Sequence, residues 1–259
     1  MYITEAVLLL DKTTYMLYIL TMDNKENLKI RQLKILKTLS GEIDDFYLCG
    51  GTALSLFYFD HRESEDLDFF TQKFSFERIQ QIIKFLEEKL GYEIKLEAEN
   101  LSEKHQAKMM VFYVQQDKNF IKIDFVEDVL PLIGKFKRID DISILSIEDI
   151  YIRKIYATSG LKVGLDEAGQ SKFIGGRQEA KDLFDLYYLS QKFLSLSEFV
   201  NKYCDQTLKE GIIRWFRRFD RMQIKMGLSE IKTSHKVEFR DIDKHFDAEI
   251  KKILLGEIG

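Results

Sequence analysis

The sequence predicts an α+β protein in which a domain with a mixed β-sheet comes first and a helical domain follows. In the first half of the chain, short apolar segments alternate with glycine turns and periodic helical segments. From Ser146 onward, apolar residues recur at helical spacing, and the only proline, Pro131, lies near the junction. We therefore place the sheet domain at residues 25–140 and the helical domain at residues 141–259, after a leader at residues 1–24.

The elements of the sheet domain follow from apolar spacing and turn residues. A first helix ends near Ser40 and is closed by Gly41, and Thr52 is predicted to cap a helix that runs to about Phe59. Another helix, Phe76–Leu90, is closed by Gly91. The predicted strands are Phe46–Cys49, Asp66–Phe70, Tyr92–Leu96, Lys108–Gln115 and Phe120–Val126, with a hairpin turn at 116–119.

The second half contains three helical segments, at residues 146–157, 179–193 and 208–226, followed by a charged tail with further helical periods. Ser146 and Asp149 form a variant of the capping box at the start of the first of them. A polar loop is predicted at residues 160–176. In the third segment, aromatic residues recur at helical spacing, which favours core packing over base stacking. The arginines of this segment form either a basic face that contacts RNA or an ordinary solvent-exposed face.

The leader contains two apolar runs that are divided by Glu5, Asp11 and Lys12. Neither run is long enough to span a bilayer, and no small-residue cleavage site follows them. Met22 opens a charged, helix-like segment. The leader is therefore either a short amphipathic element or a segment upstream of a translation start at Met22.

The composition is that of a soluble globular protein, with 45% hydrophobic and 32% charged residues among 259. A formal net charge of −4 excludes a strongly basic nucleic-acid binder but leaves a local basic face open. The two cysteines, Cys49 and Cys204, lack metal-ligand spacing and suit a reducing compartment. We predict a cytoplasmic protein without a membrane partner.

Asp66 and Asp68 lie two apart in a predicted strand, so their carboxylates project from the same face. Like charges at this distance repel, but hard oxygen ligands of this kind hold Mg²⁺ or Mn²⁺. Asp124, in the predicted strand FIKIDFV, offers a third carboxylate. The three predict a metal site suited to nucleotidyl transfer, whereas the alternative is strand-end aspartates that face solvent.

Upstream of this pair, Gly50, Gly51 and Thr52 lie at the start of a predicted helix, where backbone amides attract anions such as phosphate. The segment lacks the GK[ST] ending of a P-loop and the spacing of GxGxxG. It predicts a different kind of phosphate-binding turn.

The segment CGGTALSLFYFDHRESEDLDFF, residues 49–70, resembles the signature of the AbiEii/AbiGii toxin family of nucleotidyltransferases, a branch of the DNA polymerase β-like superfamily. RKIYA, residues 153–157, is similar to the Lys-x-x-Ala helix of that family. RQEAKDLFDLYYL, residues 177–189, is similar to its last motif. The motifs occur in family order between Phe46 and Leu189.

The resemblance implies a role for each matching residue. Gly51 and Thr52 would meet the triphosphate, and Asp66 and Asp68 would bind metal, with Asp124 matching the third carboxylate of the superfamily. Lys154 would be a phosphate-contacting or catalytic lysine, and Asp182 the acid of the last motif. The complete predicted site is catalytic Asp66, Asp68, Asp124, Lys154 and Asp182, nucleotide-binding Gly50, Gly51, Thr52, Arg62, Ser64 and Lys181, and metal-binding Asp66, Asp68 and Asp124.

Some of these assignments have simpler alternatives. Arg62 and Ser64 belong to a loop beside the aspartates, and such residues are often bystanders. Arg177, Lys181 and Asp185 are spaced four apart, which predicts one helical stripe of paired charges that solvent alone can explain.

The resemblance implies a metal-dependent nucleotidyltransferase that uses Mg²⁺ or Mn²⁺ to move a nucleoside monophosphate from a nucleoside triphosphate to an acceptor hydroxyl. It further implies the toxin of a type IV toxin–antitoxin or phage-defence system, with tRNA or another RNA as acceptor and a cognate antitoxin as partner. The alternatives are a nucleotidyltransferase that modifies a small molecule or protein, and a noncatalytic nucleotide-binding protein.

Overall fold

A computed structural model describes residues 28–101, 107–116, 119–160, 162–165, 171–174 and 176–256, and gives only the backbone of residues 162–165 and 171–174. The predicted leader and Met22 lie outside these residues. The chain forms two compact units. The first comprises the described parts of residues 1–52, 65–131 and 136–145, and the second those of residues 53–64, 132–135 and 146–259.

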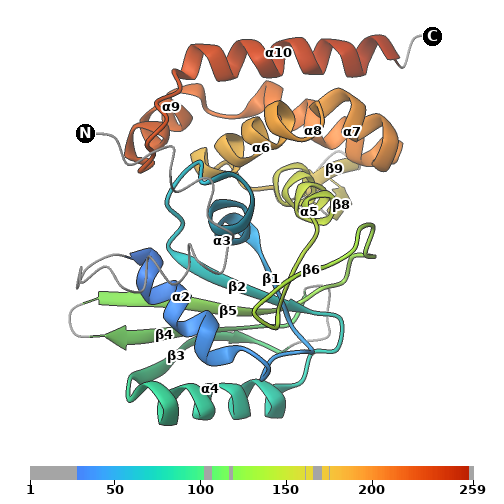
Figure 1. Cartoon of the computed structure of the whole chain (residues 1–259). Helices are drawn as coiled ribbons and strands as arrows, with labels where there is room; N and C mark the ends of the chain where they lie inside the picture. The colour runs from blue at the N-terminus through green and yellow to red at the C-terminus, as the bar shows by residue number, and fades with distance from the viewer. Residues whose placement is uncertain are drawn as a thin grey trace. The chain divides into compact units, whose positions relative to one another are not determined.

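The first unit is built on a seven-stranded sheet (Figure 1). Its elements are α2 (Leu28–Leu39), β1 (Tyr47–Cys49), β2 (Asp66–Thr71), α4 (Phe76–Leu90), β3 (Glu93–Asn100), β4 (Met109–Gln116), β5 (Asn119–Glu127), β6 (Lys137–Ile139) and β7 (Ile142–Ile144). After β1, the chain continues as α3 (Gly50–Leu54) and a π-helical turn, η2 (Ser55–Phe59), so that α3 crosses the boundary between the units.

The strand order is β3-β4-β5-β2-β1-β7-β6. Strand β2 runs parallel to β5 and antiparallel to β1, and β1 runs parallel to β7. The predicted mixed sheet and the antiparallel pairing of β4 with β5 are confirmed, and residues 117–118 of the predicted turn lie outside the described residues. Strands β6 and β7 were not predicted, because three residues are too few to show a period-two pattern.

Helix α4 shows why the predicted boundaries agree with the structure. The hydroxyl of Ser75 accepts a hydrogen bond from the amide of Arg78, and Gly91 ends the helix with a φ of 64°. The apolar face of α4 is buried, and the helix packs against α2 (Figure 1). The capping residues and the apolar periodicity both indicate a helix with the same bounds, so the bounds predicted from the sequence match those of α4.

Strands β2 and β5 form the centre of the sheet and divide their side chains between its two faces. Leu67, Phe69, Ile123 and Phe125 are fully buried on one face. Phe125 stacks on Phe69, with ring centroids 5.6 Å apart. Because side chains alternate along a strand, the residues between them, including Asp66 and Asp68, project from the opposite face.

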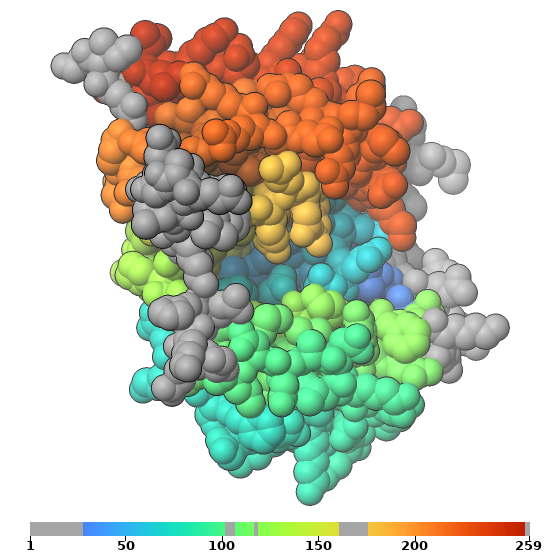
Figure 2. All heavy atoms as spheres, turned by 180° about the vertical axis from the view of Figure 1, so that it is seen from behind, coloured from blue at the N-terminus to red at the C-terminus, as the bar shows by residue number. Residues whose placement is uncertain are grey.

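Strand β3 is an edge of the sheet, and only Ile94 of its eight residues is buried. In the view from behind, the teal-to-green surface belongs to α4, β3, β4 and β5 (Figure 2). Charged side chains of β3, such as Lys95 and Glu93, protect this edge from pairing with another strand.

The second unit is mainly helical. Its remaining elements are α5 (Ile147–Ser159), β8 (Lys162–Leu165), β9 (Ser171–Ile174), α6 (Ala180–Lys192), α7 (Leu196–Tyr203), α8 (Gln206–Arg218), α9 (Arg221–Glu230) and α10 (Phe239–Gly256). Tyr151 of α5 stacks on Phe199 of α7 with ring centroids 4.0 Å apart, and both rings are fully buried. Within the described residues, no helix has both the length and the apolar character needed to cross a membrane.

Two predictions for this unit are wrong. The segment predicted as one loop at residues 160–176 contains the antiparallel pair β8 and β9. The segment predicted as one helix at residues 208–226 is divided into α8 and α9, because Asp220 caps a new helix by accepting hydrogen bonds from the amides of Met222 and Gln223. Trp215, Phe216 and Phe219 are buried, as core packing predicts.

Candidate active site

The first unit brings the three predicted metal ligands onto one face of adjacent strands. Strands β2 and β5 are parallel, with Asp66 opposite Lys122 and Asp68 opposite Asp124. Residues that are opposite in a parallel pair project from the same face. The three aspartates, which we call the carboxylate row, therefore share the face that points away from the buried Phe69 and Phe125.

Lys122 lies among these carboxylates. Its ammonium donates a hydrogen bond of 2.6 Å to Asp124 Oδ2 and lies 3.8 Å from Asp66 Oδ2. Burial lowers the pKa of Lys122, but the hydrogen bond to Asp124 and the charges of Asp124, Asp66 and Asp68 outweigh it and raise the pKa above its ordinary value. Alternation along the strand FIKIDFV places Lys122 on the same face as Asp124, but only the pairing of β5 with β2 brings the lysine beside Asp66.

The donor chemistry of the carboxylate row fits Mg²⁺ or Mn²⁺, because both ions take hard oxygen ligands and retain several waters. Within the described residues, no three histidine, cysteine or acidic side chains are grouped as a complete metal site. Asp66, Asp68 and Asp124 are the residues that would hold the ion, and the cation now among them is the Lys122 ammonium.

The glycine turn lies directly against the carboxylate row. Gly50 has a φ of +73°, and a Cβ atom at this position would overlap Asp68 Oδ2 and lie 2.8 Å from Asp68 Cγ. Only glycine permits both this backbone conformation and this approach. The antiparallel register, which places Cys49 opposite Asp68, produces the contact.

Thr52 has a different local role from the predicted one. Helix α3 begins at Gly50, so Thr52 lies inside the helix and does not cap it. Its buried hydroxyl donates a hydrogen bond to the main-chain carbonyl of Asp66. This bond fastens the glycine turn to the strand that carries the aspartates.

Gly50 combines a positive φ with a close approach to the Asp68 carboxylate, and a comparison of two alanine variants separates these two features. Gly91 is the matched control, because it also has a positive φ, of 64°, but a Cβ atom added there would have nothing within 4 Å. We expect Gly91→Ala to cost about 1–2 kcal/mol of stability, the usual penalty of the left-handed conformation, with transfer activity kept.

Gly50→Ala is expected to have the same stability cost and, in addition, to displace the Asp68 carboxylate. This displacement is expected to lower nucleotidyl transfer about a hundredfold, as a shift of about 1 Å does in active sites. Urea unfolding and label transfer measure the two effects. Equal activity in the two variants would show that the approach of Gly50 to Asp68 has no functional role.

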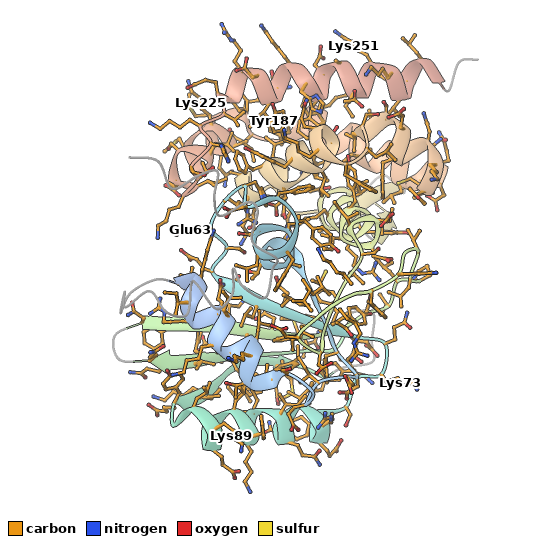
Figure 3. The ribbon with its side chains drawn as sticks, viewed as in Figure 1. Glu63, Lys73, Lys89, Tyr187, Lys225 and Lys251 are labelled. Carbon is orange, nitrogen blue, oxygen red and sulfur yellow. The ribbon has the colours of Figure 1, made fainter. Side chains whose placement is uncertain are left out.

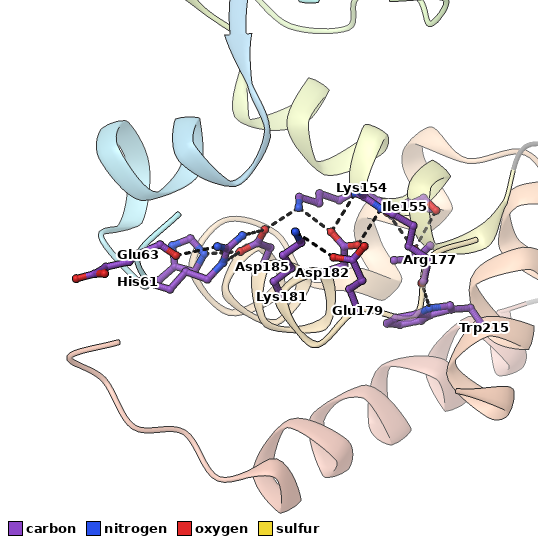
Figure 4. Close-up of polar contacts among 12 residues, drawn as sticks. His61, Glu63, Lys154, Ile155, Arg177, Glu179, Lys181, Asp182, Asp185 and Trp215 are labelled. Carbon is purple, nitrogen blue, oxygen red and sulfur yellow. Dashed lines mark hydrogen bonds and ion pairs between the residues drawn. The ribbon is translucent and has the colours of Figure 1, made fainter. Parts of the chain in front are cut away.

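In the second unit, the buried carboxylate of Asp185 is the centre of an ion network (Figure 4). Its Oδ1 accepts hydrogen bonds from His61 Nε2 at 2.7 Å and from Arg62 Nε at 2.6 Å. Its Oδ2 accepts from Arg62 Nη2 at 2.7 Å and lies 2.7 Å from Lys154 Nζ. The bidentate guanidinium geometry is the strong form of this interaction.

Asp182, one helical turn before Asp185 on α6, completes the network. Lys154 Nζ donates to Asp182 Oδ1 at 2.8 Å, and Arg177 Nη2 donates to the same oxygen at 3.2 Å. Lys154 therefore lies between two carboxylates that are both fully buried. We call His61, Arg62, Lys154, Asp182 and Asp185 the buried ion network.

Burial and pairing act in opposite directions on these groups. Desolvation raises the pKa of Asp185, but the charges of Lys154 and Arg62 and the hydrogen bonds from His61 and Arg62 hold it well below its ordinary range. Desolvation lowers the pKa of Lys154, but Asp185 and Asp182 raise it above its ordinary value. Both residues are therefore charged at neutral pH.

The start of helix α5 fixes the position of Lys154. The hydroxyl of Ser146 accepts a hydrogen bond from the amide of Asp149 and donates one to the Asp149 carboxylate, so Ser146 caps the helix as predicted. The Asp149 carboxylate also accepts hydrogen bonds of 2.8 Å from the amides of Ile133 and Gly134. These contacts anchor the helix to the segment 132–135 of the same unit.

The predicted stripe of Arg177, Lys181 and Asp185 is wrong. Helix α6 begins at Ala180, so Arg177 precedes the helix. Lys181 is exposed and pairs with Glu179 at 3.1 Å, whereas Asp185 is buried. Spacing along one helix cannot reveal that Asp185 is bound by residues from 61–62 and 154. Ser64 lies half-buried in the segment that also carries Arg62.

Comparison with known families connects these features. A family model described as "Nucleotidyl transferase AbiEii toxin, Type IV TA system" matches residues 34–257, which is most of the chain. The chain belongs to the AbiEii nucleotidyltransferase toxin family. The resemblance inferred from the sequence is confirmed, and this AbiEii member is a nucleotidyltransferase enzyme.

Solved structures with a similar fold include JHP933 from Helicobacter pylori, with 17% identity and a TM-score of 0.53, which covers 90% of this chain and 97% of that one. A putative nucleotidyltransferase from H. pylori has 18% identity and a TM-score of 0.53, over 88% and 95% of the chains. MenT4, a nucleotidyltransferase toxin from Mycobacterium tuberculosis H37Rv, has 12% identity and a TM-score of 0.51, over 95% and 90%. A search of curated proteins finds no match.

These likenesses concern the fold, and they confirm the predicted fold class for the AbiEii chain. The assignment of individual residues depends on the contacts described above.

Proposed function

We propose that this AbiEii member uses a divalent cation to transfer a nucleoside monophosphate from a nucleoside triphosphate to an acceptor hydroxyl. The observation that carries the proposal is the close approach of Gly50 to the Asp68 carboxylate, beside Asp66 and Asp124. A phosphate-binding turn and a row of hard oxygen ligands are then neighbours within one unit.

The divalent ion, when bound, supplies positive charge that stabilises the triphosphate and the developing charge on its oxygens. Asp66 and Asp68 would hold it. Asp124 would take the proton of the acceptor hydroxyl or serve as a further ligand. The acceptor oxygen bonds to the α-phosphorus, the bond from that phosphorus to the bridging oxygen breaks, and pyrophosphate leaves.

In the first unit, we assign triphosphate binding to the backbone of Gly50, Gly51 and Thr52. In the second unit, Ser64 and Lys181 are proposed to contact the nucleotide. The guanidinium of Arg62 is bonded to Asp185 and to the carbonyl of Glu63, so its proposed contact with the nucleotide requires it to leave these partners. Exposure supports Lys181 as a residue that a ligand can reach. The hydroxyl of Thr52 is bonded to Asp66, so only the amide of this residue is proposed to meet phosphate.

Lys154 and Asp182 are proposed as the catalytic pair of the second unit. Lys154 Nζ lies 2.8 Å from Asp182 Oδ1, and both side chains are buried. Buried charge pairs are poor sources of stability compared with apolar residues of similar size. This favours a functional reason for the five charged or polar groups of the buried ion network.

We further propose that the chain is the toxin of a type IV toxin–antitoxin pair, acting in phage defence with a cognate antitoxin and with tRNA or another RNA as acceptor. The family description supports the toxin role. Exposed basic residues on α8 and α9, including Arg217, Arg218 and Lys225, would suit an RNA backbone. Lys225 points outward from α9 (Figure 3).

One experiment tests transfer and identifies the acceptor. The full chain is incubated with each α-³²P nucleoside triphosphate, Mg²⁺ and either total RNA, protein extract or a small-molecule extract. We expect label to enter RNA, and EDTA to prevent it. Label in protein or in a small molecule would support the alternative acceptors, and label that stays in the free triphosphate with every acceptor would contradict the proposed transfer.

A further inference from the structure

The carboxylate row places like charges close together on one face of the sheet. Asp68 and Asp124 are directly opposite each other on β2 and β5, and Asp66 lies on the same face. Like charges opposite each other on neighbouring strands destabilise a sheet. The side chain of Asp124 is only 11% exposed, so water screens this repulsion poorly.

Lys122 supplies a counter-charge from the same sheet face. It is opposite Asp66 on β2, and two residues before Asp124 on its own strand. Its ammonium lies 2.6 Å from Asp124 Oδ2 and 3.8 Å from Asp66 Oδ2. The side chain is 29% exposed, so the ammonium can move toward water while the stem stays packed.

We propose that Lys122 is an internal counter-cation of the carboxylate row, which a divalent ion must displace in order to bind. This inference rests on the proposed function in taking these aspartates as the metal site. Lys122 is then a positioning residue with two effects. It holds Asp66 and Asp124 near each other in the metal-free protein, and it weakens metal binding because the ammonium competes for the same oxygens.

The test is calorimetric titration of Mn²⁺ into the full chain without nucleotide. We expect Lys122→Met to bind Mn²⁺ at least tenfold more tightly than the unchanged protein, which is about 1.4 kcal/mol. Lys122→Gln is a second neutral variant that keeps a polar end, and the same direction is expected. Lys122→Arg keeps the charge and is expected to bind Mn²⁺ within threefold of the unchanged protein.

Two further variants locate the effect. Lys95→Met removes an exposed lysine from β3 of the same sheet, where it pairs with Glu93 at 3.0 Å, and is expected to leave Mn²⁺ affinity unchanged. Adding Asp66→Asn to Lys122→Met is expected to remove the gain in affinity.

Thermal unfolding separates a counter-cation from a lysine that only supports the fold. In EDTA, we expect Lys122→Met to melt at a lower temperature than the unchanged protein, and saturating Mn²⁺ is expected to raise its melting temperature by a larger amount. A lower melting temperature without tighter Mn²⁺ binding would indicate support of the fold alone and would overturn the proposal.

Unchanged or weaker Mn²⁺ binding by both neutral variants, or a gain that survives Asp66→Asn, would also overturn it. The outcome is distinguishable from failure of the proposed function. If the neutral Lys122 variants bind Mn²⁺ more tightly but the unchanged protein transfers no label, the transferase activity is rejected and the role of Lys122 is kept. If the unchanged protein transfers label but the variants do not bind Mn²⁺ more tightly, the role of Lys122 is rejected and the transferase activity is kept.

Discussion

Asp68→Asn is expected to lose at least a thousandfold of nucleotidyl transfer, about 4 kcal/mol of transition-state stabilisation, while the chain stays folded. The Asp68 carboxylate lies against Gly50 and opposite Asp124, so it is the member of the carboxylate row nearest the glycine turn. An amide has nearly the same shape but no negative charge, and it is a poorer ligand for a hard cation. The measurement is the initial rate of label transfer at saturating Mg²⁺.

The matched control for this prediction is Asp44→Asn. Asp44 belongs to the same unit, but its side chain is exposed and pairs with Arg138 at 2.8 Å. An exposed pair contributes about 1 kcal/mol or less, so stability and transfer are expected to be retained. If Asp68→Asn transfers label within tenfold of the unchanged protein, the metal role of this aspartate is wrong.

Asp185→Asn is expected to reduce the free energy of unfolding by about 3–5 kcal/mol, the usual cost of breaking a buried ion pair by removing one partner. Lys154 would keep Asp182, but the guanidinium of Arg62 would lose the carboxylate that binds it in bidentate form. Urea unfolding at neutral pH measures the loss. Transfer is also expected to fall, because Lys154 would lose one of the two carboxylates that fix its position.

The pH dependence of this loss follows from the lowered pKa of Asp185. The pKa of Asp185 is close to 3.8 in the unfolded chain and lower in the folded chain. At a pH above 3.8 the carboxylate contributes its full stabilisation to the folded chain, and this contribution is lost as the pH falls through the pKa of the folded chain. The difference in stability between the unchanged protein and Asp185→Asn is therefore expected to narrow below pH 3.8. Lys154 has a raised pKa, so its own contribution is lost only above its unfolded value of 10.5.

Asp247→Asn is the control for Asp185→Asn within the second unit. Asp247 pairs with Lys251 at 2.6 Å on α10, where both side chains are exposed, and Lys251 projects outward in Figure 3. Its loss is expected to cost less than about 1 kcal/mol. A similar small cost for Asp185→Asn would show that the buried ion network does not hold its helices together.

Local sequence signals predicted the elements that depend on local contacts. Ser75 and Gly91 bound α4, and period two placed Asp66, Asp68 and Asp124 on strands that the structure pairs. Capping bonds and side-chain alternation act within a few residues, so they can be recognised without knowing the fold.

Features that depend on distant contacts were missed or predicted incorrectly. The hydroxyl of Thr52 donates a hydrogen bond from α3 to the main-chain carbonyl of Asp66 on β2 and does not cap its own helix. Lys122 becomes significant only through the register of β2 and β5. Asp185 gathers His61, Arg62 and Lys154 from two other segments, and no spacing within α6 records that arrangement.

The two compact units are not consecutive lengths of chain. After Thr52, Ser64, Pro131, Lys135 and Leu145, the polypeptide passes from one unit to the other. His61 and Arg62 are therefore encoded between two strands of the sheet, although they bind Asp185 in the second unit. A gene fragment that ends at residue 145 would separate Arg62 from Asp185. No single division of the gene therefore yields one fragment for each complete unit.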